Sequence, residues 1–152
     1  MTQTVFQTPT ANAVVDFAPT KQYPSFSSNV NQLTTLTTKT GAGVTLTYAE
    51  VLGGMIFHDT SSSGVSDTFP TAALLVPQIE GAEVGSTFRL LIRNTSAGAG
   101  SLTLVAGTGG TLSGTTASTV IPYLQQQEYL IRVTAVGATP TYTVYGLGLV
   151  TF

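Results

Sequence analysis

The sequence contains no cysteine and no tryptophan, and only one histidine. Without cysteine the chain has no disulfide bonds, no zinc–thiolate sites and no thiol nucleophile. Charged residues make up 8 % of the 152 residues, against about a quarter in a typical soluble domain. The five Lys and Arg residues are scattered and form no run. We therefore expect no nucleic-acid partner, because too few phosphates would be neutralised.

Long apolar runs are also missing. No stretch of about 18 apolar residues is present, and no basic segment followed by an apolar run opens the chain, so we expect no transmembrane helix and no signal peptide. Apolar residues still make up 42 % of the sequence, which is enough for a folded core. Thr and Ser take the place of charge, and the formal net charge is only −2. Such a surface favours a protein that works inside a large assembly; an ordinary monomer with a neutral surface is the alternative.

The first 32 residues differ in composition from the rest. They are rich in Thr, Gln and Asn, and their prolines at positions 9, 19 and 24 disfavour a helix and favour extended backbone. We expect residues 1–32 to form an extended arm that contacts a neighbouring subunit, although packing on its own domain remains open. The apolar residues expected to make this contact are Val5, Phe6, Val14, Val15, Phe17, Tyr23 and Phe26.

From about Leu33 onward, apolar and polar residues alternate with the period of two that is typical of half-buried strands. The alternation covers residues 44–48, 88–93, 101–106, 128–134 and 141–144. Turn residues separate these segments, and we interpret Gly107–Gly110 as a hairpin turn. The segment Pro70–Val76 reads as a short helix that Pro77 ends. We predict an all-β domain at residues 33–152, a jelly-roll-like β-sandwich with one short helix.

Candidate catalytic residues are few. His58 and Asp59 are adjacent, and Asp67 follows a serine-rich segment. A catalytic triad needs a serine on a defined turn and an oxyanion hole, so we interpret this region as a strand end followed by a solvated loop. One His and two Asp are too few to enclose zinc, and the ladder of a calcium loop is absent. We expect no enzymatic activity, no metal and no cofactor.

The charges on one strand offer a different kind of site. Arg89 and Arg93 have the same parity and share a face, with Leu91 between them. Arginine is enriched at protein interfaces, which favours a partner-contact surface. A second interpretation, that the arginines protect an aggregation-prone strand, remains open.

The segment Gly54–Gly148 contains an ordered set of short motifs. These are Phe69-Pro-Thr-Ala-Ala, Val84-Gly-Ser-Thr-Phe, Ile92-Arg-Asn-Thr, Leu102-Thr-Leu, Ala106–Gly114 and Thr139-Pro through Tyr145. Their order resembles a β-sandwich module of tailed-bacteriophage virion proteins, notably capsid decoration (cement) proteins and head fibres. The resemblance covers about two thirds of the chain. It implies a homotrimer on the outer capsid surface that clamps neighbouring major capsid subunits against the pressure of packaged DNA, and it implies no catalytic residues.

Three hypotheses follow. The leading one is a homotrimeric capsid decoration protein whose partners are itself and the major capsid protein. The alternative is a tail or head fibre module that binds a host receptor or glycan through exposed aromatic residues, with Tyr123, Tyr142 and Tyr145 as candidates. The third, a hydrolase, depends on His58, Asp59 and Asp67 alone.

Overall fold

The structure is a computed structural model of the whole chain, and it describes residues 34–114 and 119–151. The described residues belong to one compact unit. The predicted arm, with its seven apolar contact residues, lies outside the described residues. The arm therefore stays a prediction.

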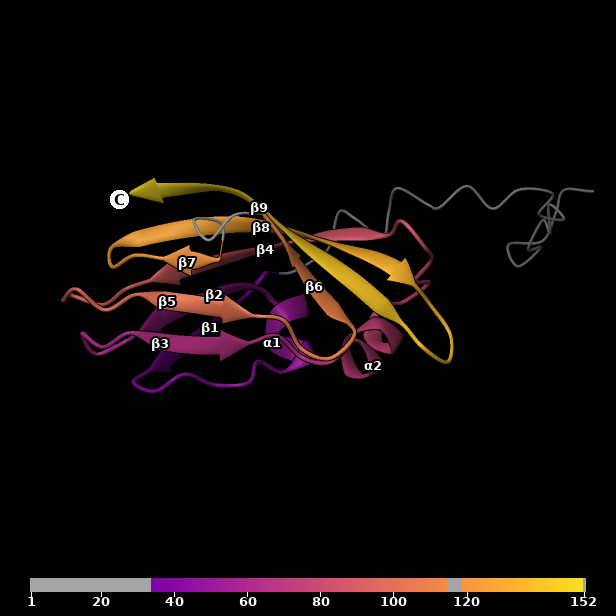
Figure 1. The fold of residues 1–152 in the computed structure, drawn as a ribbon, viewed down its shortest axis with the longest axis horizontal. Coiled ribbons are helices and arrows are strands. Elements are labelled where there is room, and N and C mark those ends of the chain that lie inside the picture. The colour runs from indigo at the N-terminus through magenta and orange to yellow at the C-terminus, as the bar shows by residue number, and fades with distance from the viewer. Residues whose placement is uncertain (1–33, 115–118, 152) are drawn as a thin grey trace, which may run out of the picture. The chain divides into compact units, whose positions relative to one another are not determined.

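Two β-sheets make up the described part of the chain, as the sequence predicted (Figure 1). The larger sheet has the strand order β1-β2-β4-β8-β9-β6. Its strands are β1 (Thr35–Thr40), β2 (Gly54–Asp59), β4 (Thr87–Asn94), β8 (Gln125–Ala135), β9 (Thr141–Thr151) and β6 (Gly110–Ser113). The smaller sheet has the order β3-β5-β7, with β3 (Val65–Thr68), β5 (Leu102–Val105) and β7 (Val120–Ile121).

Strand direction in both sheets is mixed. Among the described strands, β1 with β2, β2 with β4, β3 with β5 and β6 with β9 are parallel, and the other pairs are antiparallel. This differs from the antiparallel Greek-key pairing of a jelly roll. It also corrects the hairpin at Gly107–Gly110, because this turn joins β5 to β6, which lie in different sheets.

One hydrophobic core joins the inner faces of the two sheets. The larger sheet contributes Ile56, Leu90, Ile92, Tyr129, Ile131, Val133, Tyr142 and Val144, and the smaller sheet contributes Leu102, Leu104 and Ile121. Along β4 and β8 every second residue is buried, which is the alternation that the sequence showed. The core therefore fixes which face of each strand is turned outward.

Two short helices accompany the sheets. The expected helix forms as α2 (Ala72–Leu75), and Figure 1 shows it beyond the carboxyl ends of β3 and β5. It continues through Pro77 as the 3-10 turn η2 (Val76–Gln78), since proline is tolerated in a first turn. The second helix, α1 (Tyr48–Leu52), was not expected. No helix of the described residues is long and apolar enough to cross a membrane.

The strand predicted at residues 44–48 does not form. Thr45 makes only an isolated parallel bridge to Thr68, and the helix α1 starts at Tyr48. Thr47 caps this helix in a capping box with Glu50, so two backbone donors at the helix start are satisfied. The sequence Thr-Tyr-Ala-Glu carries this signal, and the local capping outweighs a short period-two pattern.

Tyr142 closes the core at the end nearest α2. Its hydroxyl donates a 2.7 Å hydrogen bond to the carbonyl of Pro70, and its ring lies 6.4 Å from the ring of Phe69. Gly110 begins β6 opposite Tyr142, where a Cβ atom would lie 2.5 Å from the tyrosine ring. Only glycine leaves room for the ring at this position.

A matched pair of tyrosine variants tests this difference in hydrogen bonding. Tyr129 is equally buried, but its hydroxyl has no hydrogen-bond partner among the described residues. We expect Tyr142→Phe to lower the free energy of unfolding by about 1–2 kcal/mol, because the Pro70 carbonyl loses its donor. Tyr129→Phe should leave it unchanged or raise it. Urea unfolding of both variants measures the contrast, and an equal loss in both would contradict it.

Candidate functional site: a buried polar layer between the sheets

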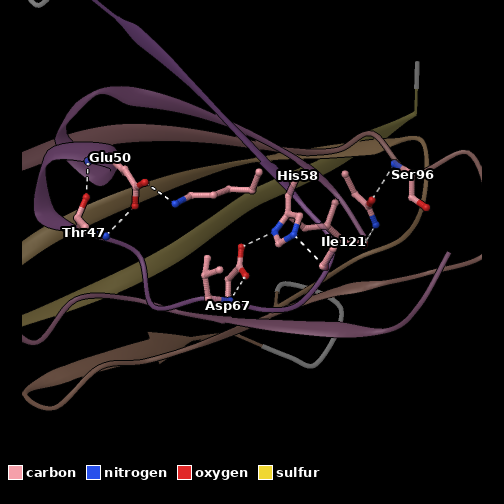
Figure 2. Close-up of polar contacts among 10 residues, drawn as sticks. Thr47, Glu50, His58, Asp67, Ser96 and Ile121 are labelled. Atoms are coloured by element: carbon pink, nitrogen blue, oxygen red, sulfur yellow. Dashed lines mark hydrogen bonds and ion pairs between the residues drawn. The ribbon is translucent and has the colours of Figure 1, made fainter. Parts of the chain in front are cut away.

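An ion pair crosses from one sheet to the other. His58 lies on β2 and Asp67 on β3, and both residues are 0 % exposed. The Nδ1 atom of His58 lies 2.9 Å from Oδ2 of Asp67, and its Nε2 atom lies 3.2 Å from the carbonyl oxygen of Gly41 (Figure 2). The other carboxylate oxygen of Asp67 accepts a 3.0 Å hydrogen bond from the backbone N–H of Val44.

The alternation of β2 places this histidine. Ile56 and His58 both face the core, so the histidine takes the next inward position after an apolar residue. The predicted strand end followed by a solvated loop fits the structure, because β2 ends at Asp59 and residues 61–64 are exposed; the burial of His58 was not expected. His58 does stand near the end of its strand, but Asp67 comes from the other side of that loop and meets it inside the molecule.

The pair favours a charged imidazole. The hydrogen bond to Asp67 raises the pKa of His58 above its usual value, burial opposes the rise, and the carboxylate charge adds to it. An imidazolium donates from both nitrogens, and here each nitrogen has an acceptor. Because neither nitrogen is free and the ring is fully buried, the pair is built to hold the two sheets together. Asp59 does not join it; its carboxylate accepts from the backbone N–H of Ser61.

A second buried polar residue, Asn94, lies beside His58. Asn94 on β4 is in register with His58 and is 0 % exposed. Its amide nitrogen donates to the carbonyls of Gly100, at 2.9 Å, and Ile121, at 3.1 Å. Its oxygen accepts from the backbone N–H of Ser96, so one side chain satisfies three backbone groups (Figure 2). Asn94 thereby connects β4 to β7 and holds the loop that follows β4.

The serine of this loop continues the network. Ser96 is fully buried, and its hydroxyl oxygen accepts a 3.0 Å hydrogen bond from the backbone N–H of Ser62. Ser62 has a φ of 65°, a left-handed conformation that is uncommon for serine. The serine-rich loop at residues 61–63 is thus tied to the loop after β4. No serine hydroxyl among these contacts reaches His58.

A third contact anchors α1 to the sheet edge. Lys39 on β1 forms an ion pair with Glu50, which also closes the capping box of α1 (Figure 2). Partial burial acts to raise the pKa of Glu50, but the hydrogen bonds from Lys39 and Thr47 outweigh it, so the pKa is lowered. The edge strand and the helix beside it are therefore joined by charge.

The outer face of the larger sheet carries the predicted strand site. The side chains of Arg89, Leu91 and Arg93 on β4 all point away from the core, since Leu90 and Ile92 between them are buried. Arg89 forms an exposed ion pair with Glu128 at 2.7 Å. The Arg93 guanidinium lies over the ring of Phe57, 5.3 Å from its centroid.

Two rows of side chains cross this face in register. One row runs from Leu36 through Met55 and Leu91 to Glu128, and the other contains Phe57, Arg93, Gln126 and Val150. Leu36 and Val150 are exposed, and Met55, Phe57 and Leu91 are half-buried. We call these eight residues the outer-sheet surface. Sequence reasoning found only its β4 members, because strand pairing brings the others together.

The tyrosines proposed for receptor binding do not share one surface property. Tyr123 is exposed and Tyr145 is half-buried, but Tyr142 is in the core and cannot contact a receptor.

Among the described residues, no three His, Cys, Asp or Glu side chains cluster to hold a metal ion. Comparison of the chain with protein-family models, with curated proteins and with solved structures found no match.

Proposed function

We propose that the protein is a structural protein of a virion, a capsid decoration protein that binds the outer capsid surface as a homotrimer and joins neighbouring major capsid subunits. The observation that carries this proposal is the outer-sheet surface, where apolar residues and stacked arginine lie together on a sheet face. A purely solvated sheet face is normally polar. Aromatic residues and arginine are the types enriched where proteins bind each other.

The rigidity of the domain supports the same role. The His58–Asp67 pair and the Asn94 contacts tie the two sheets across the core, so the outer-sheet surface is presented on a fixed frame. Many copies on one shell would add weak contacts into strong attachment. The two facing sheets also support a relationship to the jelly-roll sandwich, with parallel pairs as a departure from its usual pairing.

Co-sedimentation with empty capsids tests this function. The capsids are assembled from the major capsid protein of the same genome without this chain, and the wild-type protein should saturate them. Leu91→Glu should weaken binding by about ten-fold or more, because it replaces the central apolar side chain of the surface by a carboxylate that must lose its water on binding and that lies opposite Glu128. Val105→Glu is the matched control, since Val105 is exposed on β5 in the other sheet.

Two outcomes would contradict the proposal. A wild-type protein that ignores capsids refutes decoration, and binding of the isolated protein to host-envelope material would then favour the fibre alternative through Tyr123. Equal binding by the wild type and Leu91→Glu would remove the outer-sheet surface from the contact.

A further inference from the structure

Half of β9 has a free backbone edge among the described residues. β6 pairs with β9 only from Tyr142 to Tyr145, whereas β9 continues to Thr151 beside β8. Figure 1 shows β9 running past the end of β6 toward the C-terminus. We call residues 146–151 the β9 edge. Its outward N–H and C=O groups face no other described strand.

The side chains of the β9 edge are apolar on both sides of the sheet. Leu149 pairs with the inward-facing Gln127, and Val150 pairs with the outward-facing Gln126, so the two point to opposite faces. Their exposed fractions are 37 % and 55 %, and Leu147 is 48 % exposed. Three large apolar side chains are thus open to solvent within four residues.

Charge and proline, two of the usual protections of an edge strand, are missing from this part of the sequence. Proteins guard free edges with charged residues, proline, β-bulges or a covering element. Within the β9 edge, the pairing with β8 has one register shift, between Gly146 and Gly148, and continues regularly to Thr151. From Thr141 to Phe152 the sequence contains no charged residue and no proline. The opposite edge of the same sheet is different, because β1 carries Lys39 and is joined by it to Glu50 of α1. A strand edge that has no charge, no proline and no described strand beside it is suited to pairing with another strand.

We propose that the β9 edge pairs with the β9 edge of a second copy of this chain, as an antiparallel extension of the larger sheet. The partner strand must be apolar on both faces, and of the described strand edges the β9 edge itself meets this requirement. The β9 edge has no charged residue that would favour pairing with a different protein. Antiparallel pairing of two identical edges closes both in one contact, so association ends there instead of forming fibres.

This contact has two-fold symmetry and does not depend on the proposed decoration function. It differs from any contact around a three-fold axis, and in a trimeric protein it would join one trimer to another. The mass of the protein in solution therefore distinguishes this pairing from the homotrimer of the decoration proposal. Pairing of β9 edges gives an even number of copies, two or six, whereas a homotrimer without this pairing has three. Capsid binding is measured separately and can succeed or fail independently.

Light scattering over a concentration series up to about 1 mM, the range of weak contacts, measures the mass. The wild type should form a dimer or hexamer, and Val150→Lys should halve its mass, because a charge on the edge blocks pairing. Val84→Lys is the control, since Val84 is 62 % exposed in the loop before β4, and its mass should stay that of the wild type. A monomer or trimer in the wild type, or an unchanged mass in Val150→Lys, would overturn the proposal.

Cysteine cross-linking gives a second readout, and the chain has no native cysteine to confuse it. In a two-fold antiparallel pair, residues near the axis face their own copies at a distance that a disulfide can bridge. Leu149→Cys and Val150→Cys, oxidised mildly, should yield covalent dimers from at least one of the two variants. Val84→Cys should yield none. Cross-linking no better than that of Val84→Cys at both positions would also overturn the pairing.

Discussion

Replacing His58 with alanine should lower the free energy of unfolding by about 3–5 kcal/mol, since removal of one partner leaves the other charge buried and unpaired. Asp67 would keep only the hydrogen bond from the Val44 N–H, in a site that is 0 % exposed. The Gly41 carbonyl would lose its contact as well. Urea unfolding, monitored by tyrosine fluorescence or circular dichroism, measures the change.

Two comparisons make this result specific to the pair. Asp59→Ala is the matched control, because Asp59 is adjacent to His58 but accepts only a loop N–H; we expect a loss of about 1 kcal/mol or less. The double variant His58→Leu with Asp67→Val should be less destabilised than His58→Ala, since no charge is left buried. A loss below about 1 kcal/mol in His58→Ala would show that the pair does not hold the sheets together.

The same pair predicts how stability depends on pH. The pKa of His58 is raised in the folded protein, so the folded state holds the proton more tightly than the unfolded state does. The stabilisation is fully present below the unfolded pKa of about 6.5 and is lost as pH rises through the folded pKa. The free energy of unfolding should therefore fall as pH rises above neutrality in the wild type, and this fall should be absent in the double variant. The single histidine also gives one set of imidazole NMR signals, which titrates directly.

Asn94→Asp should be as damaging as the loss of the ion pair, with an expected cost of about 3 kcal/mol or more. The substitution keeps the size of the side chain but replaces the amide donor by a carboxylate oxygen. That oxygen would face the carbonyls of Gly100 and Ile121 with no proton between them. Both carbonyls would lose their donor, and a charge would be buried.

Gln126→Glu is the control for this exchange. It makes the same amide-to-carboxylate change on the outer face of the larger sheet, beside Arg93. We expect its effect to stay within about 0.5 kcal/mol, as for other surface substitutions. Lowering the pH should also separate the two variants, because only the carboxylate buried at position 94 would regain stability on protonation. Equal stability of both variants would contradict a role for Asn94 in joining β4 to β7.

The strands were the most predictable part of the fold. In β4 and β8 buried residues alternate with more exposed ones, and the apolar and polar residues of the sequence alternate in the same way. Strand order was not predictable in this way, since alternation says which residues face inward but not which strands are neighbours. The parallel pair of β6 and β9 joins residues about thirty positions apart, and no short-range sequence pattern predicts this pairing.

The buried polar layer shows a different limit. His58 and Asp67 were noticed as a candidate group, but they were interpreted as a strand end and a solvated loop because no serine on a defined turn and no oxyanion hole accompanied them. Asn94 was noted only as part of a sequence motif and not as a buried polar residue, although its inward position on β4 continues the parity of Leu90 and Ile92. A polar residue at an inward position of a regular strand was the available signal. The partners of such a residue come from other strands, so the sequence could not name them.

The position of β9 between β8 and β6 has a consequence for synthesis. β6 is made before β8 and β9, yet its only strand partner among the described residues is β9. As the chain leaves the ribosome, β6 must therefore wait as an unpaired segment until more than twenty further residues have emerged. Long-range pairing of this kind is slow and exposes strand edges meanwhile. We expect the larger sheet to be completed only after β9 has cleared the ribosomal tunnel, so that nascent chains arrested before β9 lack a finished core.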